Sequence, residues 1–188
     1  GKSPQIVFAD ADLDAALPFL VNAGIQNAGQ TCSAASRILV QRPVFDEVLR
    51  RMAERYHALR VGPAMADLDL GPLISRRQQE LVQGYLELAQ GQGLRVAAQA
   101  PLPTGLPAGG FYVQPTLVAD VAATHRIAQE EVFGPVQAVI PFDDEAEALA
   151  IANGTPFGLV AGVWTCDGAR QMRMARKLGV ITYRSAME

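Results

Sequence analysis

Two patterns of apolar residues alternate along the chain. Short, nearly continuous apolar runs predict strands at residues 5–8, 37–41, 94–98, 111–118, 136–142, 159–165 and 180–183. Runs without an alternating polar face are typical of strands that are buried on both sides. Pro115 interrupts the fourth run, which indicates either a strand at the edge of a sheet or a break in the strand.

Between these runs, apolar residues recur every three or four positions, as they do on one face of a helix. This spacing predicts helices at 13–28, 44–59 and 75–92, a fourth that Asp143 and Asp144 cap and that ends near Asn153, and a fifth from Asp167 to Lys177. Pro18 lies inside the first helix, so that helix is expected to begin later or to have a kinked first turn.

Strands that alternate with helices predict an α/β fold, a three-layer domain whose mostly parallel sheet is covered by helices on both faces. A chain of 188 residues, 49% of them hydrophobic, is long enough for one such domain. Residues 99–110 contain three prolines and three glycines, and we expect a surface loop there and not a linker between domains.

Charge and cysteine content exclude several classes of protein. A formal net charge of -3, with acids and bases interspersed, favours neither nucleic acid nor an anionic membrane as a partner. No apolar run is long enough to span a bilayer, and residues 1–4 lack the apolar core of a signal peptide. Two cysteines make no disulfide framework, and their spacing from His57 and His125 fits no zinc site. The sequence therefore favours a cytoplasmic protein without a metal.

Cys32 is the first candidate for chemistry, because it lies among small and polar residues where a helical pattern gives way to an apolar run. Gly29 admits backbone angles that other residues avoid, and Ser33 and Ala34 are small enough to let another molecule approach the sulfur. The thiolate is the nucleophilic form of cysteine, and a helix that began at residues 33–36 would stabilise it.

Other interpretations of the cysteines stay open. A buried cysteine that packs as a small hydrophobe is the commoner case, and it is the interpretation that Cys166 favours. A cysteine hydrolase also needs a histidine to activate the thiol. His57 and His125 are better explained as solvated or capping residues, so the hydrolase hypothesis is weak.

The second candidate is the segment from Gln129 to Val136, which holds Glu130, Glu131, Phe133 and a rigid Gly-Pro turn. Adjacent acids and an aromatic ring normally mean a solvated turn and a core residue. They are also suited to accepting hydrogen bonds from a ribose and packing against a flat ring. No phosphate-binding glycine loop is present. The basic residues of the last helix are predicted to form a solvated face.

Several motifs together resemble the catalytic domain of the NAD(P)-dependent aldehyde dehydrogenases. They occur in the family's order from Gly1 to about Gly179: Gly1-Lys2-Ser3-Pro4 with Ile6-Val7-Phe8-Ala9-Asp10, Asn27-x-Gly29-Gln30-x-Cys32, Gly71-Pro72-Leu73-Ile74, Gly110-Phe111-Tyr112-Val113-Gln114-Pro115-Thr116, Glu130-Glu131-Val132-Phe133-Gly134-Pro135-Val136 and Asn153-x-x-x-Phe157-Gly158-Leu159. The resemblance implies that Cys32 attacks an aldehyde, that Glu131 binds the nicotinamide ribose, and that Phe133 packs near NAD or NADP. It implies a homo-oligomeric parent protein, a dimer or tetramer.

The resemblance also implies parts that these 188 residues do not contain. The family's general-base glutamate would lie three positions before Gly1, and the oxyanion asparagine and the cofactor-binding domain would lie further upstream. Residues 180–188 depart from the family's usual continuation. We therefore expect residues 1–188 to be an incomplete catalytic domain that is inactive alone. A coenzyme A-acylating enzyme and a non-catalytic domain that reuses the fold remain alternatives.

Overall fold

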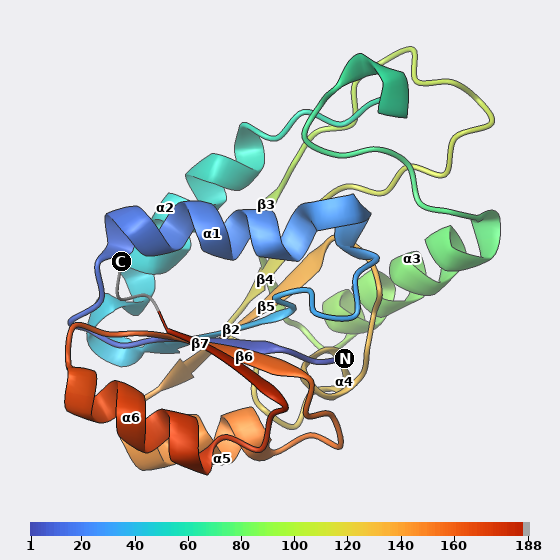
Figure 1. Cartoon of the computed structure of the whole chain (residues 1–188). Coiled ribbons are helices and arrows are strands. Elements are labelled where there is room, and N and C mark those ends of the chain that lie inside the picture. Colours follow the sequence, from blue (N-terminus) through green and yellow to red (C-terminus); the bar gives the residue numbers. More distant parts are fainter. Residues whose placement is uncertain (186–188) are drawn as a thin grey trace.

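A computed structural model describes residues 1–185 of the chain, and within them seven strands form one sheet (Figure 1). The order across the sheet is β3-β4-β5-β2-β1-β6-β7. The strands are β1 (Pro4–Val7), β2 (Arg37–Gln41), β3 (Arg95–Gln99), β4 (Thr116–Ala119), β5 (Val136–Phe142), β6 (Val160–Trp164) and β7 (Thr182–Ser185). All neighbouring strands are parallel except β3, which runs antiparallel to β4 at the edge.

Helices cover both faces of this sheet, as the alternating pattern predicts. They are α1 (Leu13–Ile25), α2 (Phe45–His57), α3 (Arg76–Gly91), α4 (Arg126–Gln129), α5 (Glu145–Asn153) and α6 (Gly168–Lys177). Helices α1 and α2 lie on one face and α5 and α6 on the other, which gives three layers (Figure 1). The short helix α4 escapes prediction because four residues hold too few apolar positions to show a period.

The predicted elements agree with the structure except at particular residues. Helix α1 does begin at Leu13, because the Asp12 carboxylate accepts hydrogen bonds from the backbone N–H groups of Asp14 and Ala15. Pro18 is accommodated inside the helix, so a later start is excluded. Pro115 lies directly before β4, and the predicted strand at 111–118 is shortened to its second half. The break is therefore the correct alternative.

Two buried polar side chains hold the layers together. Arg37 is 1% exposed and donates to the carbonyls of Lys2, Ile151 and Ala152, so it joins β1 to the end of α5. Gln137 is fully buried. Its Nε2 donates to the carbonyls of Leu20 and Ala35, and its Oε1 accepts from the Tyr56 hydroxyl at 2.7 Å. Buried polar groups are tolerated where they are hydrogen-bonded in this way.

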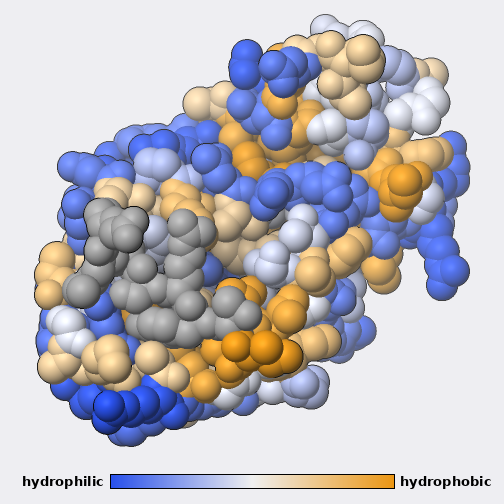
Figure 2. Space-filling view, viewed as in Figure 1, coloured by the Kyte–Doolittle hydropathy of each residue, from blue (hydrophilic) through white to orange (hydrophobic). Residues whose placement is uncertain are grey.

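The sheet is least completely covered near β6. Val160 and Trp164 of β6 are half-buried, whereas the strand residues of β1 are buried. On the face seen in Figure 2, hydrophobic residues reach the surface below α1, on the side of β6. Within residues 1–185, no helix is both long and apolar enough to cross a membrane.

Candidate active site

Three segments that the sequence singles out meet at one edge of the sheet. Residues 1–3 precede β1, residues 32–36 precede β2, and residues 131–135 precede β5. These strands are parallel neighbours in the order β5-β2-β1, so their amino ends lie side by side. The segments that lead into them therefore form one site, although they are far apart in the sequence.

The chain reaches Cys32 through a left-handed turn. Asn27, Ala28 and Gly29 have φ angles of 52°, 53° and 74°, which non-glycine residues rarely adopt. The turn is closed by the Gln30 amide, which donates to the Asn27 carbonyl at 3.1 Å. The side-chain amides of Asn27 and Gln30 add two reciprocal hydrogen bonds of 3.1 Å. Strain of this kind persists where the surroundings hold it, and it is common at functional sites.

Cys32 itself is exposed, in a turn that the Ala34 amide closes by donating to the Thr31 carbonyl at 3.0 Å. The expectation of a helix that begins after the thiol is wrong, because residues 32–36 form this turn and then enter β2. Burial as a small hydrophobe is also wrong for both cysteines, since Cys166 is exposed as well. The chain thus presents two free thiols to solvent, and only Cys32 lies at the edge where the three segments meet.

The turn before Cys32 touches the loop that holds Glu131 and Phe133, backbone against backbone. A Cβ on Gly29 would lie 2.1 Å from the carbonyl oxygen of Gly134, closer than any real Cβ contact. A Cβ on Gly134 would in turn lie 2.4 Å from the Val82 side chain of α3. Glycine is thus required at position 29, a Cβ at position 134 would have to displace Val82, and the two loops are locked together without any side chain between them.

Phe133 adopts a strained conformation in this second loop. Its φ is 54° and its ring is 37% exposed, an uncommon combination for a bulky apolar residue. Gln78 of α3 holds the loop in place, because its Nε2 donates to the carbonyl of Val132 at 3.1 Å and to that of Phe133 at 2.8 Å. The ring is therefore presented to solvent by a rigid backbone.

The two adjacent glutamates have different surroundings. Arg126 binds the Glu130 carboxylate through two hydrogen bonds of 2.7 Å, and the Tyr85 hydroxyl adds a third of 2.7 Å. The Arg126 guanidinium and the Tyr85 hydroxyl, in that order, lower the pKa of Glu130 to about 2. Glu131 is 34% exposed and accepts from the backbone nitrogen of Gly1. Glu130 is thus fully engaged in structure, whereas Glu131 has oxygen lone pairs left for a ligand.

Lys2 is a buried cation beside these carboxylates. It is 2% exposed, and burial, followed by repulsion from Arg37, lowers its pKa from 10.5 to about 7. The charges of Glu131 and Glu130 act in the opposite direction but do not outweigh burial. Lys2 therefore changes its charge near neutral pH inside the site.

Neither histidine belongs to the three segments that meet at this edge of the sheet. His57 is the exposed last residue of α2, and the Nδ1 of His125 accepts from the Ala122 amide at 3.0 Å in a turn. Both are therefore solvated or capping residues, as predicted. Within residues 1–185, no group of three or more metal-binding side chains is close enough to hold an ion.

Gln78 and Lys2 are the site residues that sequence reasoning missed. Gln78 lies in the polar first turn of α3, where glutamine is ordinary, so its position carries no signal. Lys2 enters the sequence argument only as a member of the Gly1-Lys2-Ser3-Pro4 motif. Lysine is usually exposed, so residue type gave no signal of its burial two positions before β1.

Comparison with known proteins identifies the chain. The sequence model of the aldehyde dehydrogenase family matches residues 1–183, which include all three segments of the site. The chain belongs to the aldehyde dehydrogenase family. The resemblance expected from its motifs is thereby confirmed, as is the α/β fold of the family's catalytic domain.

Individual aldehyde dehydrogenases are similar to the chain over nearly its whole length. Betaine aldehyde dehydrogenase of Sinorhizobium fredii is 43% identical over 179 residues, which are 95% of this chain and 37% of that protein. A Burkholderia cenocepacia protein whose structure is assigned to the aldehyde dehydrogenases is 57% identical, with a TM-score of 0.97 over 98% of this chain and 39% of that one. The aldehyde dehydrogenase of Mycobacterium tuberculosis, solved with NAD+, is 42% identical, with a TM-score of 0.93 over 98% of this chain and 38% of its own. The chain thus spans somewhat more than a third of the length of these relatives.

Proposed function

We propose that the full-length protein oxidises an aldehyde to a carboxylic acid with NAD or NADP, and that Cys32 is its nucleophile. The observation that carries this proposal is the backbone lock between Gly29 and Gly134. It joins an exposed thiol to a loop that presents a carboxylate with unused lone pairs and a strained aromatic ring. A rigid arrangement of this kind is what a reaction between a thiol-bound substrate and a second bound molecule requires.

The proposed chemistry begins at the sulfur. The Cys32 thiolate attacks the carbonyl carbon of the aldehyde, so that a C–S bond forms and the carbonyl oxygen becomes an oxyanion. When bound, NAD(P) supplies the two-electron acceptor that converts this adduct into a thioester on Cys32. Water then cleaves the C–S bond, the carboxylic acid leaves, and the thiol is restored.

Glu131 and Phe133 fit the nicotinamide end of the cofactor. A carboxylate with unused lone pairs accepts hydrogen bonds from the two hydroxyls of a ribose. An exposed ring on a fixed backbone offers a face for a flat heterocycle. Glu130 is not suited to this role, because Arg126 and Tyr85 already occupy its carboxylate.

The wider properties of the parent protein belong to the same proposal. We infer a cytoplasmic homo-oligomer, a dimer or tetramer, that acts on a small aldehyde. The Sinorhizobium relative is named for betaine aldehyde, so that compound is one substrate to be tried. Transfer of the thioester to coenzyme A is the alternative fate of the intermediate, and the product distinguishes it from hydrolysis.

The test compares the two free cysteines in the full-length protein. We expect Cys32→Ser to lower the rate of NADH formation from an aldehyde by at least about a thousandfold, because the hydroxyl is a far weaker nucleophile. Cys166→Ser, which also removes an exposed thiol, should leave the rate unchanged. Iodoacetamide should modify Cys32 faster than Cys166. Equal labelling together with full activity of Cys32→Ser would show that Cys32 is not the nucleophile, whereas a wild-type protein that forms no NADH from any aldehyde would support a non-catalytic domain.

A further inference from the structure

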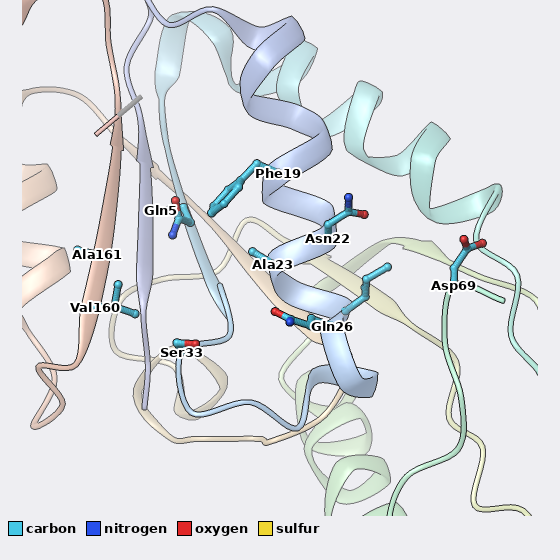
Figure 3. A pocket seen from close by; sticks show the side chains of 10 residues that line it. Gln5, Phe19, Asn22, Ala23, Gln26, Ser33, Asp69, Val160 and Ala161 are labelled. Carbon is cyan, nitrogen blue, oxygen red and sulfur yellow. The ribbon is translucent and has the colours of Figure 1, made fainter. Parts of the chain in front are cut away.

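A cavity of about 510 Å³ opens beside the residue that follows Cys32. It lies between α1 and the strands β1 and β6, at the part of the sheet that is least completely covered (Figure 3). Phe19, Ala23, Val160 and Ala161 give it apolar walls, and Ser33 closes the end near the thiol. Because Ser33 directly follows Cys32, the cavity begins one residue along the chain from the thiol.

Gln5 of β1 contributes a buried amide to this cavity. The side chain is 5% exposed, and its Oε1 accepts from the indole Nε1 of Trp164 at 3.0 Å. An indole N–H only donates, so the oxygen of the Gln5 amide must face Trp164 and the NH2 group must face away from it. Figure 3 shows this nitrogen turned toward the end of the cavity where Val160 and Ser33 lie.

The neighbours of Gln5 keep its amide in that orientation. Gly162 of β6 pairs with Gln5, and a Cβ at residue 162 would lie 2.0 Å from the Gln5 Oε1. Because residue 162 is a glycine, the space that the Gln5 amide occupies stays open. Trp164 is itself held by Phe19, with ring centroids 5.3 Å apart. Among the residues whose side chains the structure describes, none accepts a hydrogen bond from the Gln5 NH2 group, so this donor faces the cavity without a protein partner.

Among the residues whose side chains the structure describes, the walls of the cavity offer no unpaired charge to a ligand. Asp69 is the one ionisable residue among those that line it, and its carboxylate is bound by the Arg60 side chain and backbone amide. The remaining polar groups are the amides of Gln5, Asn22 and Gln26 and the hydroxyl of Ser33. A buried donor left unpaired is unfavourable, so a ligand that carries an acceptor oxygen gains where an alkyl chain or a quaternary ammonium group does not.

We propose that this cavity binds the tail of the aldehyde, and that the Gln5 NH2 group selects neutral aldehydes that carry a hydroxyl or carbonyl oxygen in that tail. The inference rests on the proposed function, because the tail reaches the cavity only from a substrate bound at Cys32. Gln5 is then a specificity-determining residue, and it takes no part in the chemical step.

The experiment measures kcat/KM of the full-length enzyme for matched aldehydes. Glycolaldehyde, 3-hydroxypropanal and 4-hydroxybutanal are each compared with the alkyl aldehyde in which a methyl group replaces the hydroxyl. Betaine aldehyde is compared with its neutral isostere, 3,3-dimethylbutanal. We expect at least one hydroxyaldehyde to be favoured over its partner by about 3- to 12-fold, the range of one neutral hydrogen bond. The ammonium compound should not be favoured over its isostere.

Substitutions test whether Gln5 causes the preference for hydroxyaldehydes. Gln5→Met keeps the volume of the side chain and removes the donor, so the hydroxyl preference should fall to about one. Gly162→Ala keeps Gln5 but displaces its amide, and should have the same effect. Gln171→Met is the matched control, because Gln171 is equally buried, at 4% exposed, in α6 on the other face of the sheet. It should leave the preference intact.

The possible failures are distinguishable. A preference that survives both Gln5→Met and Gly162→Ala overturns the role of Gln5, as does a wild-type enzyme that favours the alkyl aldehydes or betaine aldehyde over their partners. In each case the enzyme still oxidises aldehydes, so the proposed function stands. A wild-type enzyme that oxidises none of the aldehydes with NAD or NADP overturns both proposals.

Discussion

Residues of the same type behave differently in this site because of what surrounds them. Glu130 and Glu131 are neighbours with the same side chain, yet one is held by Arg126 and Tyr85 and the other is left with free lone pairs. Considered by residue type, the two glutamates supported a single hypothesis, that adjacent acids accept hydrogen bonds from a ribose. Arg126 is an i, i+4 neighbour of Glu130, so that pair is local, but Tyr85 comes from α3, 45 residues away, and no local pattern announces its contact.

Gly29 provides the first prediction at this scale. Gly29→Ala should lower the free energy of unfolding by about 1–3 kcal/mol, because the new Cβ cannot fit against the Gly134 carbonyl without moving the loop. Urea unfolding of the chain measures the change. Gly93→Ala is the matched control, since Gly93 has nearly the same φ, 73° against 74°, with nothing within 4 Å of its Cβ position. Equal losses in both variants would show that only backbone angle matters and that the loops are not locked.

At the scale of elements, the position of the site follows from parallel pairing. The segments that carry Gly1, Cys32 and Glu131 lead into β1, β2 and β5, and parallel neighbours bring the amino ends of these three strands together. The strands themselves were predictable from continuous apolar runs. Their order in the sheet was not, because residues 37–41 and 136–142 are equally apolar and nothing local says which strands are neighbours. The meeting of Cys32 with Glu131 therefore needed the structure.

The buried hydrogen bonds of Gln137 join β5 to its neighbouring segments, and they provide the prediction at this scale. Gln137→Leu should lower the free energy of unfolding by about 2–4 kcal/mol, because it removes the bonds from β5 to α1, to the segment after Cys32 and to α2. Chemical denaturation measures the loss.

A double-mutant cycle with Tyr56→Phe tests the mechanism. The Tyr56 hydroxyl donates to Gln137, so once that hydroxyl is gone Gln137→Leu leaves one fewer buried group unpaired. The second substitution should then cost less than it does in the wild type. Strict additivity of the two losses would contradict a shared network.

At the scale of the whole molecule, buried charge links stability to pH. The pKa of Lys2 is lowered from 10.5 to about 7 by burial, so between these values the unfolded chain binds a proton that the folded chain does not. The free energy of unfolding should therefore rise with pH above 7, by at most about 1.4 kcal/mol per pH unit from this group, and show no such contribution below pH 7.

The comparison of wild type with Lys2→Met isolates this contribution, because all other titrations cancel. The difference in unfolding free energy between them, measured from pH 6 to 9, should favour the wild type increasingly as pH rises. Lys177→Met is the control, since Lys177 is the other lysine of the sequence and is exposed at the end of α6. The same pH-dependent difference in that variant would contradict the assignment to Lys2.

Sequence and structure agree best where the physics is local. The α/β class, the cap at Asp144 and the stop near Asn153 follow from short-range periodicity and capping, and they are observed. Packing between segments that are distant in the chain decides three other features. Both cysteines are exposed, Lys2 is buried, and the NH2 group of Gln5 faces the cavity. Residue type alone pointed the wrong way for Cys166, because cysteine is buried more often than not.

The left-handed turn before Cys32 has a stereochemical consequence. Asn27 and Ala28 adopt backbone angles that are strained for L-residues and relaxed for their mirror images. A D-alanine at position 28, introduced by chemical ligation, would fit this backbone with less strain than the natural residue. The chain therefore positions the exposed thiol of Cys32 partly through a stretch of inverted handedness, where chirality itself restricts the paths that lead the backbone to the sulfur.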